Sequence, residues 1–185
     1  QALPVMHLII DGYNLIRQSD AFRQSEKVSL EEGRHALLRS LSQYRKRTGH
    51  RITVVFDAWV SGSPEVERDR YGSIAILYSQ RGRTADDLIK RIVQERREAL
   101  VVVTSDREIA DFAARRGVPA VSSPDFEARL LEAATGAARP AGNAVPDRNG
   151  VREDREPSSV GTKKKGPSRR LSKKQRAVQS AFRKL

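Results

Sequence analysis

Short apolar, β-branched runs alternate with longer segments of helical period along the first 136 residues, and this alternation restricts the fold more than any other feature. The runs predict strands over Val5–Asp11, Arg51–Asp57, Ser73–Ser79, Leu100–Ser105 and Ala120–Ser122. Strands that alternate with helices of this length build a mostly parallel sheet with helices on both faces. The sequence therefore predicts an α/β domain.

Four helices are expected between and after these strands, each with a recognisable start. They begin at Ser29, at Thr84, after Asp106 and at Ser123. In the last helix, Ser123 is the expected N-cap and Pro124 the first residue, a position that proline favours.

Three aspartates stand where predicted strands end. Asp11, Asp57 and Asp106 each follow an apolar run directly or within three residues. Because the carboxyl ends of parallel strands meet at one edge of a sheet, we expect these side chains to converge there. Each also has a purely structural interpretation: Asp11-Gly12 as a turn, Asp57 as a strand end and Asp106 as a helix N-cap.

Converging carboxylates raise one another's pKa, and a divalent cation relieves the repulsion. Oxygen ligands without cysteine or clustered histidine favour Mg²⁺ or Mn²⁺ over Zn²⁺. The sequence has no cysteine, and its three histidines are scattered.

Asp86 and Asp87 are separated by helical geometry. Asp86 shares a face with Ile89 and Val93 and leans toward the buried side, so it is the better candidate ligand. Asp87 falls at the third helical position, where a carboxylate caps the helix or supports the site indirectly.

Polar residues near the acidic positions are candidates for contacts with a ligand. Asn14 would bond a ligand, a phosphate or its own backbone. Arg81, Arg83 and Arg107 suit phosphate contacts or are ordinary surface charge.

The charge is concentrated at the end of the sequence. Residues 137–185 hold 14 Lys and Arg against four Asp and Glu, a net +10 of the total +12. Residues 1–136 are expected to form the folded domain, 137–167 a disordered linker and 168–185 a basic amphipathic helix that folds on a partner. The candidate RNA contacts there are Lys163, Lys164, Lys165, Arg169, Arg170, Lys173 and Lys174. The alternative is a solvated tail.

No apolar run approaches the ~20 residues of a membrane span. We expect a cytoplasmic protein without a membrane partner.

The segments around the aspartates resemble those of the YacP-like NYN-domain proteins, part of the wider PIN-like nuclease superfamily. The matching segments lie within roughly residues 5–134 and are Leu8–Ile16, Val54–Ala58, Gly82–Asp86 and Val103–Arg107. The resemblance implies a Rossmann-like three-layer fold and metal-dependent endoribonuclease activity. It also implies a metal site at Asp11, Asp86 and Asp106, supported by Asn14 and Asp57.

The resulting hypothesis is hydrolysis of single-stranded RNA, with the tail docking on RNA (mRNA, tRNA or rRNA) or on a ribonucleoprotein such as the ribosome. Two alternatives remain. A non-catalytic RNA-binding module would bind through its basic tail. A small-molecule phosphohydrolase would also suit a sheet edged with aspartates, although Tyr13 stands where many aspartyl-phosphate enzymes carry a second aspartate.

Overall fold

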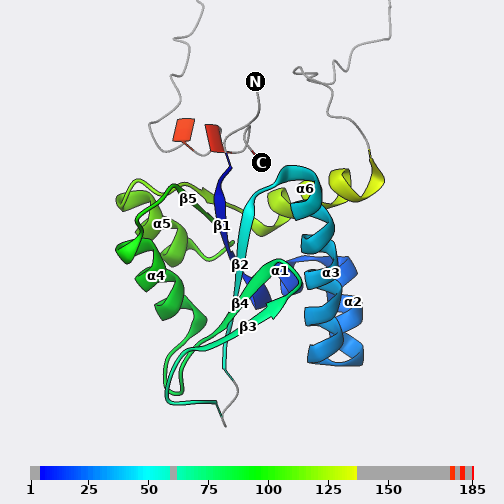
Figure 1. Ribbon diagram of the computed structural model, residues 1–185, viewed down its shortest axis with the longest axis horizontal. Coiled ribbons are helices and arrows are strands. Elements are labelled where there is room, and N and C mark those ends of the chain that lie inside the picture. Colours follow the sequence, from blue (N-terminus) through cyan, green and yellow to red (C-terminus); the bar gives the residue numbers. More distant parts are fainter. Residues whose placement is uncertain (1–4, 59–61, 137–175, 178–179, 182–184) are drawn as a thin grey trace, which may run out of the picture.

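The computed structural model describes residues 5–58, 62–136, 176–177, 180–181 and 185, and it places one sheet between two layers of helices (Figure 1). The elements in chain order are β1 (His7–Asp11), α1 (Gly12–Gln18), α2 (Asp20–Val28), α3 (Leu30–Thr48), β2 (Arg51–Phe56), β3 (Glu67–Tyr71), β4 (Ile74–Tyr78), α4 (Ala85–Glu95), β5 (Leu100–Val103), α5 (Arg107–Arg115), β6 (Ala120–Val121) and α6 (Ser123–Thr135).

The sheet has six strands in the order β3-β4-β2-β1-β5-β6. All pairings are parallel except that of β3 with β4. The α/β class with a mostly parallel sheet, expected from the sequence, is confirmed.

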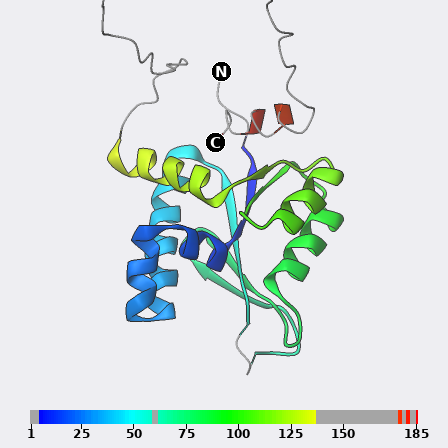
Figure 2. The same ribbon diagram turned by 180° about the vertical axis from the view of Figure 1, so that it is seen from behind.

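Alternate residues of the central strand face two separate cores. Leu8 and Ile10 pack with residues of α1, α3 and α6, whereas Ile9 packs with residues of α4 and α5. Figures 1 and 2 show the corresponding layers, with α4 and α5 on one side of the sheet and α1, α2, α3 and α6 on the other. Because β1 is buried on both faces, its near-continuous apolar run is the pattern that this position requires.

Three elements were not predicted from the sequence. The strand β3 reads Glu-Arg-Asp-Arg-Tyr and is mostly exposed, so it shows no alternation of apolar and polar residues. It is held as an antiparallel edge strand by its hydrogen bonds to β4. The helices α1 and α2 span only 7 and 9 residues, and their burial of Leu15, Ile16 and Phe22 depends on tertiary packing.

The predicted N-cap of the last helix is wrong by one residue. The hydroxyl of Ser122 accepts the backbone N–H of Asp125, so Ser122 is the cap and Ser123 begins α6. The hydroxyl of Ser123 is used elsewhere, in a bond to Asn14.

Described residues near the end of the sequence pack against the domain. Ala181 and Leu185 are 4% and 8% exposed and belong to the core cluster that includes Tyr44. The hydroxyl of Tyr44 donates to the main-chain oxygen of Leu185 at 2.7 Å. Figure 1 shows this end of the chain beside the amino end of β1.

The proposed linker lies outside the described residues, so the boundaries at 136 and 167 stay predictions. Among the described residues, no helix combines the length and apolar character that crossing a bilayer requires.

If Leu185 is part of this core, Leu185→Ala will lower the free energy of unfolding by about 2 kcal/mol, since it removes buried methyl groups and leaves a cavity. Ser180→Ala, at an exposed position, should change it by less than about 0.5 kcal/mol. Urea denaturation of the full chain measures both. Equal stabilities would show that Leu185 does not contribute to the core.

Candidate metal site at the carboxyl ends of the strands

Three strands bring aspartates to the same edge of the sheet. Asp11 is the last residue of β1, Asp57 follows β2 directly, and Asp106 follows β5 by three residues. β1 lies between β2 and β5 in the sheet. The chain crosses from one side of β1 to the other between β4 and β5, so the β1–β5 boundary is the switch point where ligands bind in sheets of this kind.

Gly12 allows the helix α1 to begin immediately after Asp11. A Cβ atom at Gly12 would lie 2.3 Å from a ring carbon of the buried Phe56. The side chain of Phe56 therefore occupies the space that any other residue would need, and glycine is required for β1 to turn directly into α1 at this edge.

The connection from β4 to α4 adds Asp86. The backbone N–H of Ala85 donates to Oδ1 of Asp57 at 2.6 Å, which ties the start of α4 to the end of β2. Asp86 is the next residue, and its side chain is half-buried. The acidic residues of four separate segments therefore lie at one edge.

Thr104 connects two of the aspartates. Its hydroxyl donates to Oδ2 of Asp11 at 3.1 Å and accepts the backbone N–H of Asp106 at the same distance. Thr104 is 2% exposed, so this link is shielded from water. The role of Thr104 was not predicted from the sequence, although a hydroxyl residue between a strand and an aspartate is a usable signal.

The carboxylates perturb one another. Burial raises the pKa of Asp11 from 3.8 to about 6; the Thr104 hydrogen bond opposes this rise, and the charges of Asp86 and Asp57 add to it. Burial is also the main cause of the raised pKa of Asp86, followed by the charge of Asp106, and Lys90 acts in the opposite direction. The charges of Asp57 and Asp86 therefore act on Asp11, and those of Asp57 and Asp106 act on Asp86.

Asp87 and Asp106 both stabilise helix starts. Asp87 and Thr84 exchange hydrogen bonds as a capping box at the start of α4. Oδ1 of Asp106 accepts the backbone N–H groups of Glu108 and Ile109 at the start of α5. No hydrogen bond from the described residues reaches Oδ2 of Asp106, so one of its oxygens is available to a ligand while the other caps the helix.

The donor atoms suit a hard cation. Asp57 and Asp106 each use one carboxylate oxygen in the bonds above, which leaves the other oxygen of each for a ligand. Within the described part of the chain, however, no three acidic or histidine side chains are already gathered as a cation cage. Carboxylate oxygens are the type of ligand that Mg²⁺ and Mn²⁺ prefer.

Asn14 lies at the same edge. Its Oδ1 accepts the backbone N–H of Ser105 at 2.9 Å and the hydroxyl of Ser123 at 2.7 Å. These serines were not identified from the sequence, because their roles depend on loops that meet only in the fold.

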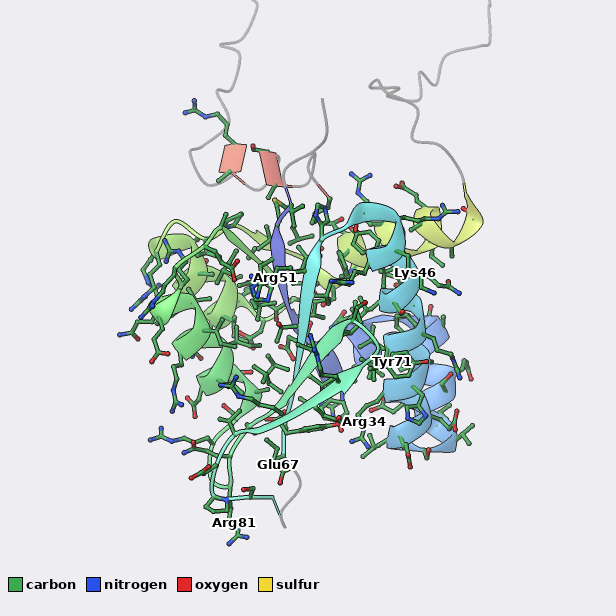
Figure 3. All side chains as sticks on the ribbon, viewed as in Figure 1. Arg34, Lys46, Arg51, Glu67, Tyr71 and Arg81 are labelled. Atoms are coloured by element: carbon green, nitrogen blue, oxygen red, sulfur yellow. The ribbon has the colours of Figure 1, made fainter. Side chains whose placement is uncertain are left out.

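The three arginines near the edge have different surroundings. Arg83 lines an open groove of about 390 Å³ that runs along α4, and its other charged lining residues are Asp87, Lys90, Arg91 and Glu95. Arg107 is exposed at the start of α5. Arg81, labelled in Figure 3 at the tip of the loops, donates through Nε to the backbone oxygen of Gly62 at 3.0 Å. Only Arg83 among them lines the groove.

The basic residues predicted to bind RNA near the end of the sequence lie outside the described residues, and their roles stay predictions. They are Lys163, Lys164, Lys165, Arg169, Arg170, Lys173 and Lys174.

Comparison with known proteins identifies similar chains. Residues 8–181 match the family model of the YacP-like NYN domain. The protein YacP of Bacillus subtilis (strain 168) is 30% identical over 87 residues, which are 47% of this chain and 51% of that protein. The chain thus aligns with about half the length of this curated relative.

Two crystal structures of Rae1 (YacP) from Bacillus subtilis share the fold. One, of a point mutant, has a TM-score of 0.61 at 23% identity and covers 71% of this chain and 79% of that chain. The other has a TM-score of 0.58 at 25% identity and covers 70% of this chain and 75% of that chain. The three-layer, PIN-like arrangement expected from the sequence is confirmed by these matches.

The raised pKa of Asp11 predicts a pH-dependent stability in metal-free buffer. Because the folded state holds the Asp11 proton more tightly than the unfolded state, the contribution of Asp11 to stability will fall as pH rises from about 4 to about 6. Asp11→Asn removes this buried charge and should raise the free energy of unfolding at pH 7.5 by roughly 1–3 kcal/mol, with little gain at pH 4.

Denaturation in EDTA at the two pH values tests this, with the exposed Asp69→Asn as the matched control. A loss of stability in Asp11→Asn at pH 7.5 would mean that the Asp11 charge is compensated in the folded protein.

Proposed function

Because the chain belongs to the YacP-like NYN domain family, a nuclease-like family, we propose that it is a metal-dependent endoribonuclease that hydrolyses phosphodiester bonds in single-stranded RNA. The observation that carries the proposal is that Asp11, Asp57, Asp86 and Asp106 lie at the same edge of the sheet, where burial and neighbouring carboxylates raise the pKa values of Asp11 and Asp86. Such perturbed carboxylates in one place are typical of sites that do chemistry.

The side chains have distinct proposed tasks. Asp11 and Asp106 would hold the divalent ion, with Asp11 oriented by the Thr104 hydroxyl. Asp86 would hold a second ion or position the attacking water. Asp57 fixes the start of α4, and with it Asp86, through the Ala85 backbone N–H.

Mg²⁺ or Mn²⁺ is the proposed cofactor. When bound, it would acidify water and neutralise charge on the phosphate. The protein's contribution is to place four aspartates at one edge of the sheet, where Asp11 is buried and Asp86 and Asp106 are half-buried.

The groove along α4 is the proposed path for RNA beside the site. Its wall starts at Ser79 and Gln80 after β4, and Ser79 also accepts the backbone N–H of Ala58, next to Asp57. Arg83 and Arg91 are exposed on its rim and available to phosphates. The basic residues beyond position 137 would add sequence-independent affinity for RNA or for a ribonucleoprotein such as the ribosome.

The two rival functions make different demands on the site. A binding module needs no carboxylates at the switch point. A phosphohydrolase that forms an aspartyl-phosphate needs a second aspartate near Asp11. The residue at that place, Tyr13, instead packs its ring 5.0 Å from that of Phe56 and is 8% exposed.

Neighbouring aspartates of α4 give the sharpest test of the proposal. With Mn²⁺ and labelled single-stranded RNA, Asp86→Asn should reduce internal cleavage at least about 100-fold, because it removes a carboxylate from the reacting centre. Asp87→Asn should retain the cleavage rate at saturating RNA within about threefold, because Asp87 caps the helix and lines the groove instead of holding the ion. Asp11→Asn and EDTA should abolish cleavage.

Two outcomes would contradict this. RNA binding without cleavage by the wild-type protein would favour the binding module. Faster turnover of a chromogenic phosphomonoester than of RNA would favour the phosphohydrolase.

The groove generates a separate prediction. Arg83→Ala and Arg91→Ala should each weaken RNA binding several-fold and lower the slope of log affinity against log salt by about one, since each removes one phosphate contact. The control is Arg39→Ala, an exposed position of α3 in the helix layer on the other side of the sheet. Fluorescence anisotropy in EDTA measures all three. Equal losses of RNA affinity in Arg39→Ala and Arg83→Ala would show that RNA does not run along the groove.

A further inference from the structure

Hydrogen bonds at Asn14 join three segments that are distant in the sequence. Asn14 lies in the first turns of α1, Ser105 in the loop after β5, and Ser123 at the start of α6. Ser105 and Ser123 both donate to Oδ1 of Asn14, and the hydroxyl of Ser105 accepts the backbone N–H of Ser123 at 3.1 Å. The loop between β5 and α5, which carries Asp106, is thereby locked to α1 and α6.

These bonds fix which way the Asn14 amide faces. A backbone N–H can only donate, so the atom that meets the N–H of Ser105 must be the amide oxygen. With the hydroxyl of Ser123 as a second donor, both lone pairs of Oδ1 are occupied. Oδ1 would have to give up a hydrogen bond before it could bind a metal ion.

The amide nitrogen of Asn14 is the free end of the side chain. No acceptor among the described residues bonds Nδ2, and Nδ2 is not one of their buried unpaired polar atoms. The nitrogen is therefore not completely buried, and Asn14 as a whole is half-buried. The amide oxygen of Asn14 accepts the backbone N–H of Ser105. Ser105 lies between Asp106 and Thr104, whose hydroxyl donates to Asp11.

We propose that Ser123 is a positioning residue, which fixes Asn14 as a hydrogen-bond donor to a phosphate oxygen of the RNA; this rests on the endoribonuclease function proposed above. Asn14 thus binds the anionic substrate, while the carboxylates bind the cation. A neutral donor suits this place because it attracts a phosphate without repelling the metal.

The fold explains why Ser123 is available for this role. Ser122 caps α6, so the hydroxyl of Ser123 is not needed at the helix start. Ser123 is fully buried, so water does not compete for its bond to Asn14.

Adjacent serines provide the matched variants. Ser123→Ala removes a donor to Oδ1 and should weaken RNA binding in EDTA about tenfold, a loss typical of residues that orient a binding group. Ser122→Ala disturbs the same helix start but does not touch Asn14, so it should leave RNA affinity unchanged. Mn²⁺ binding should be unchanged in both variants.

A second variant separates the donor role of Asn14 from a metal-ligand role. Asn14→Asp keeps an oxygen for Ser105 and Ser123 but replaces the NH₂ donor with a second carboxylate oxygen. The proposal predicts that RNA affinity and cleavage fall at least tenfold while Mn²⁺ binding is kept. If Asn14 were a metal ligand, this variant would cleave RNA as well as the wild type.

The direct readout is the ¹⁵N-resolved side-chain NH₂ signal of Asn14 in the full chain. It should shift when a short mixed-sequence single-stranded RNA is added in EDTA, and shift less in Ser123→Ala. An unmoved Asn14 signal, or wild-type cleavage by Asn14→Asp, would overturn the proposal even if the protein is a nuclease. Absence of cleavage by the wild-type protein in Mn²⁺ would instead count against the proposed function.

Discussion

A carboxylate buried at the end of the central strand is the constraint on which the other features of this edge depend. Asp11 is 7% exposed, and burial raises its pKa to about 6. The fold supports it with the Thr104 hydroxyl and with a glycine that lets α1 start at once. Neighbouring acids make its charge less favourable still. A site in which burial and neighbouring acids disfavour a carboxylate charge is suited to binding a cation, because the cation offsets that charge.

The same aspartates serve structure and chemistry together. Asp106 caps α5 through one oxygen, and Asp57 anchors the start of α4 through one oxygen. In each case the structural bond fixes the side chain and leaves the other oxygen for a ligand. The two interpretations that the sequence left open for Asp106, helix cap and metal ligand, are therefore compatible. In Asp87, the backbone N–H donates to the Thr84 hydroxyl and the carboxylate accepts the backbone N–H of Thr84, so both groups serve the capping box.

The sequence predicted those parts of the molecule that depend on local pattern. The apolar runs of β1, β2 and β5 are long and buried, so their strands and the aspartates that follow them could be read directly. The edge strand β3 could not, because its charged residues form a strand only against β4. The serines around Asn14 were missed for a related reason. Their hydrogen bonds join residues 91 and 109 positions apart, and no local pattern encodes such contacts.

The central claim is that the strand-end carboxylates form a cation site, and a direct Mn²⁺ titration tests it most simply. Electron paramagnetic resonance of free Mn²⁺ at pH 7.5 should show at least one bound ion per chain in the wild type. That ion should be lost or bound at least tenfold more weakly in Asp11→Asn, and retained in the exposed Asp69→Asn. Equal Mn²⁺ binding by all three proteins would contradict the claim and leave the raised pKa values of Asp11 and Asp86 without this explanation.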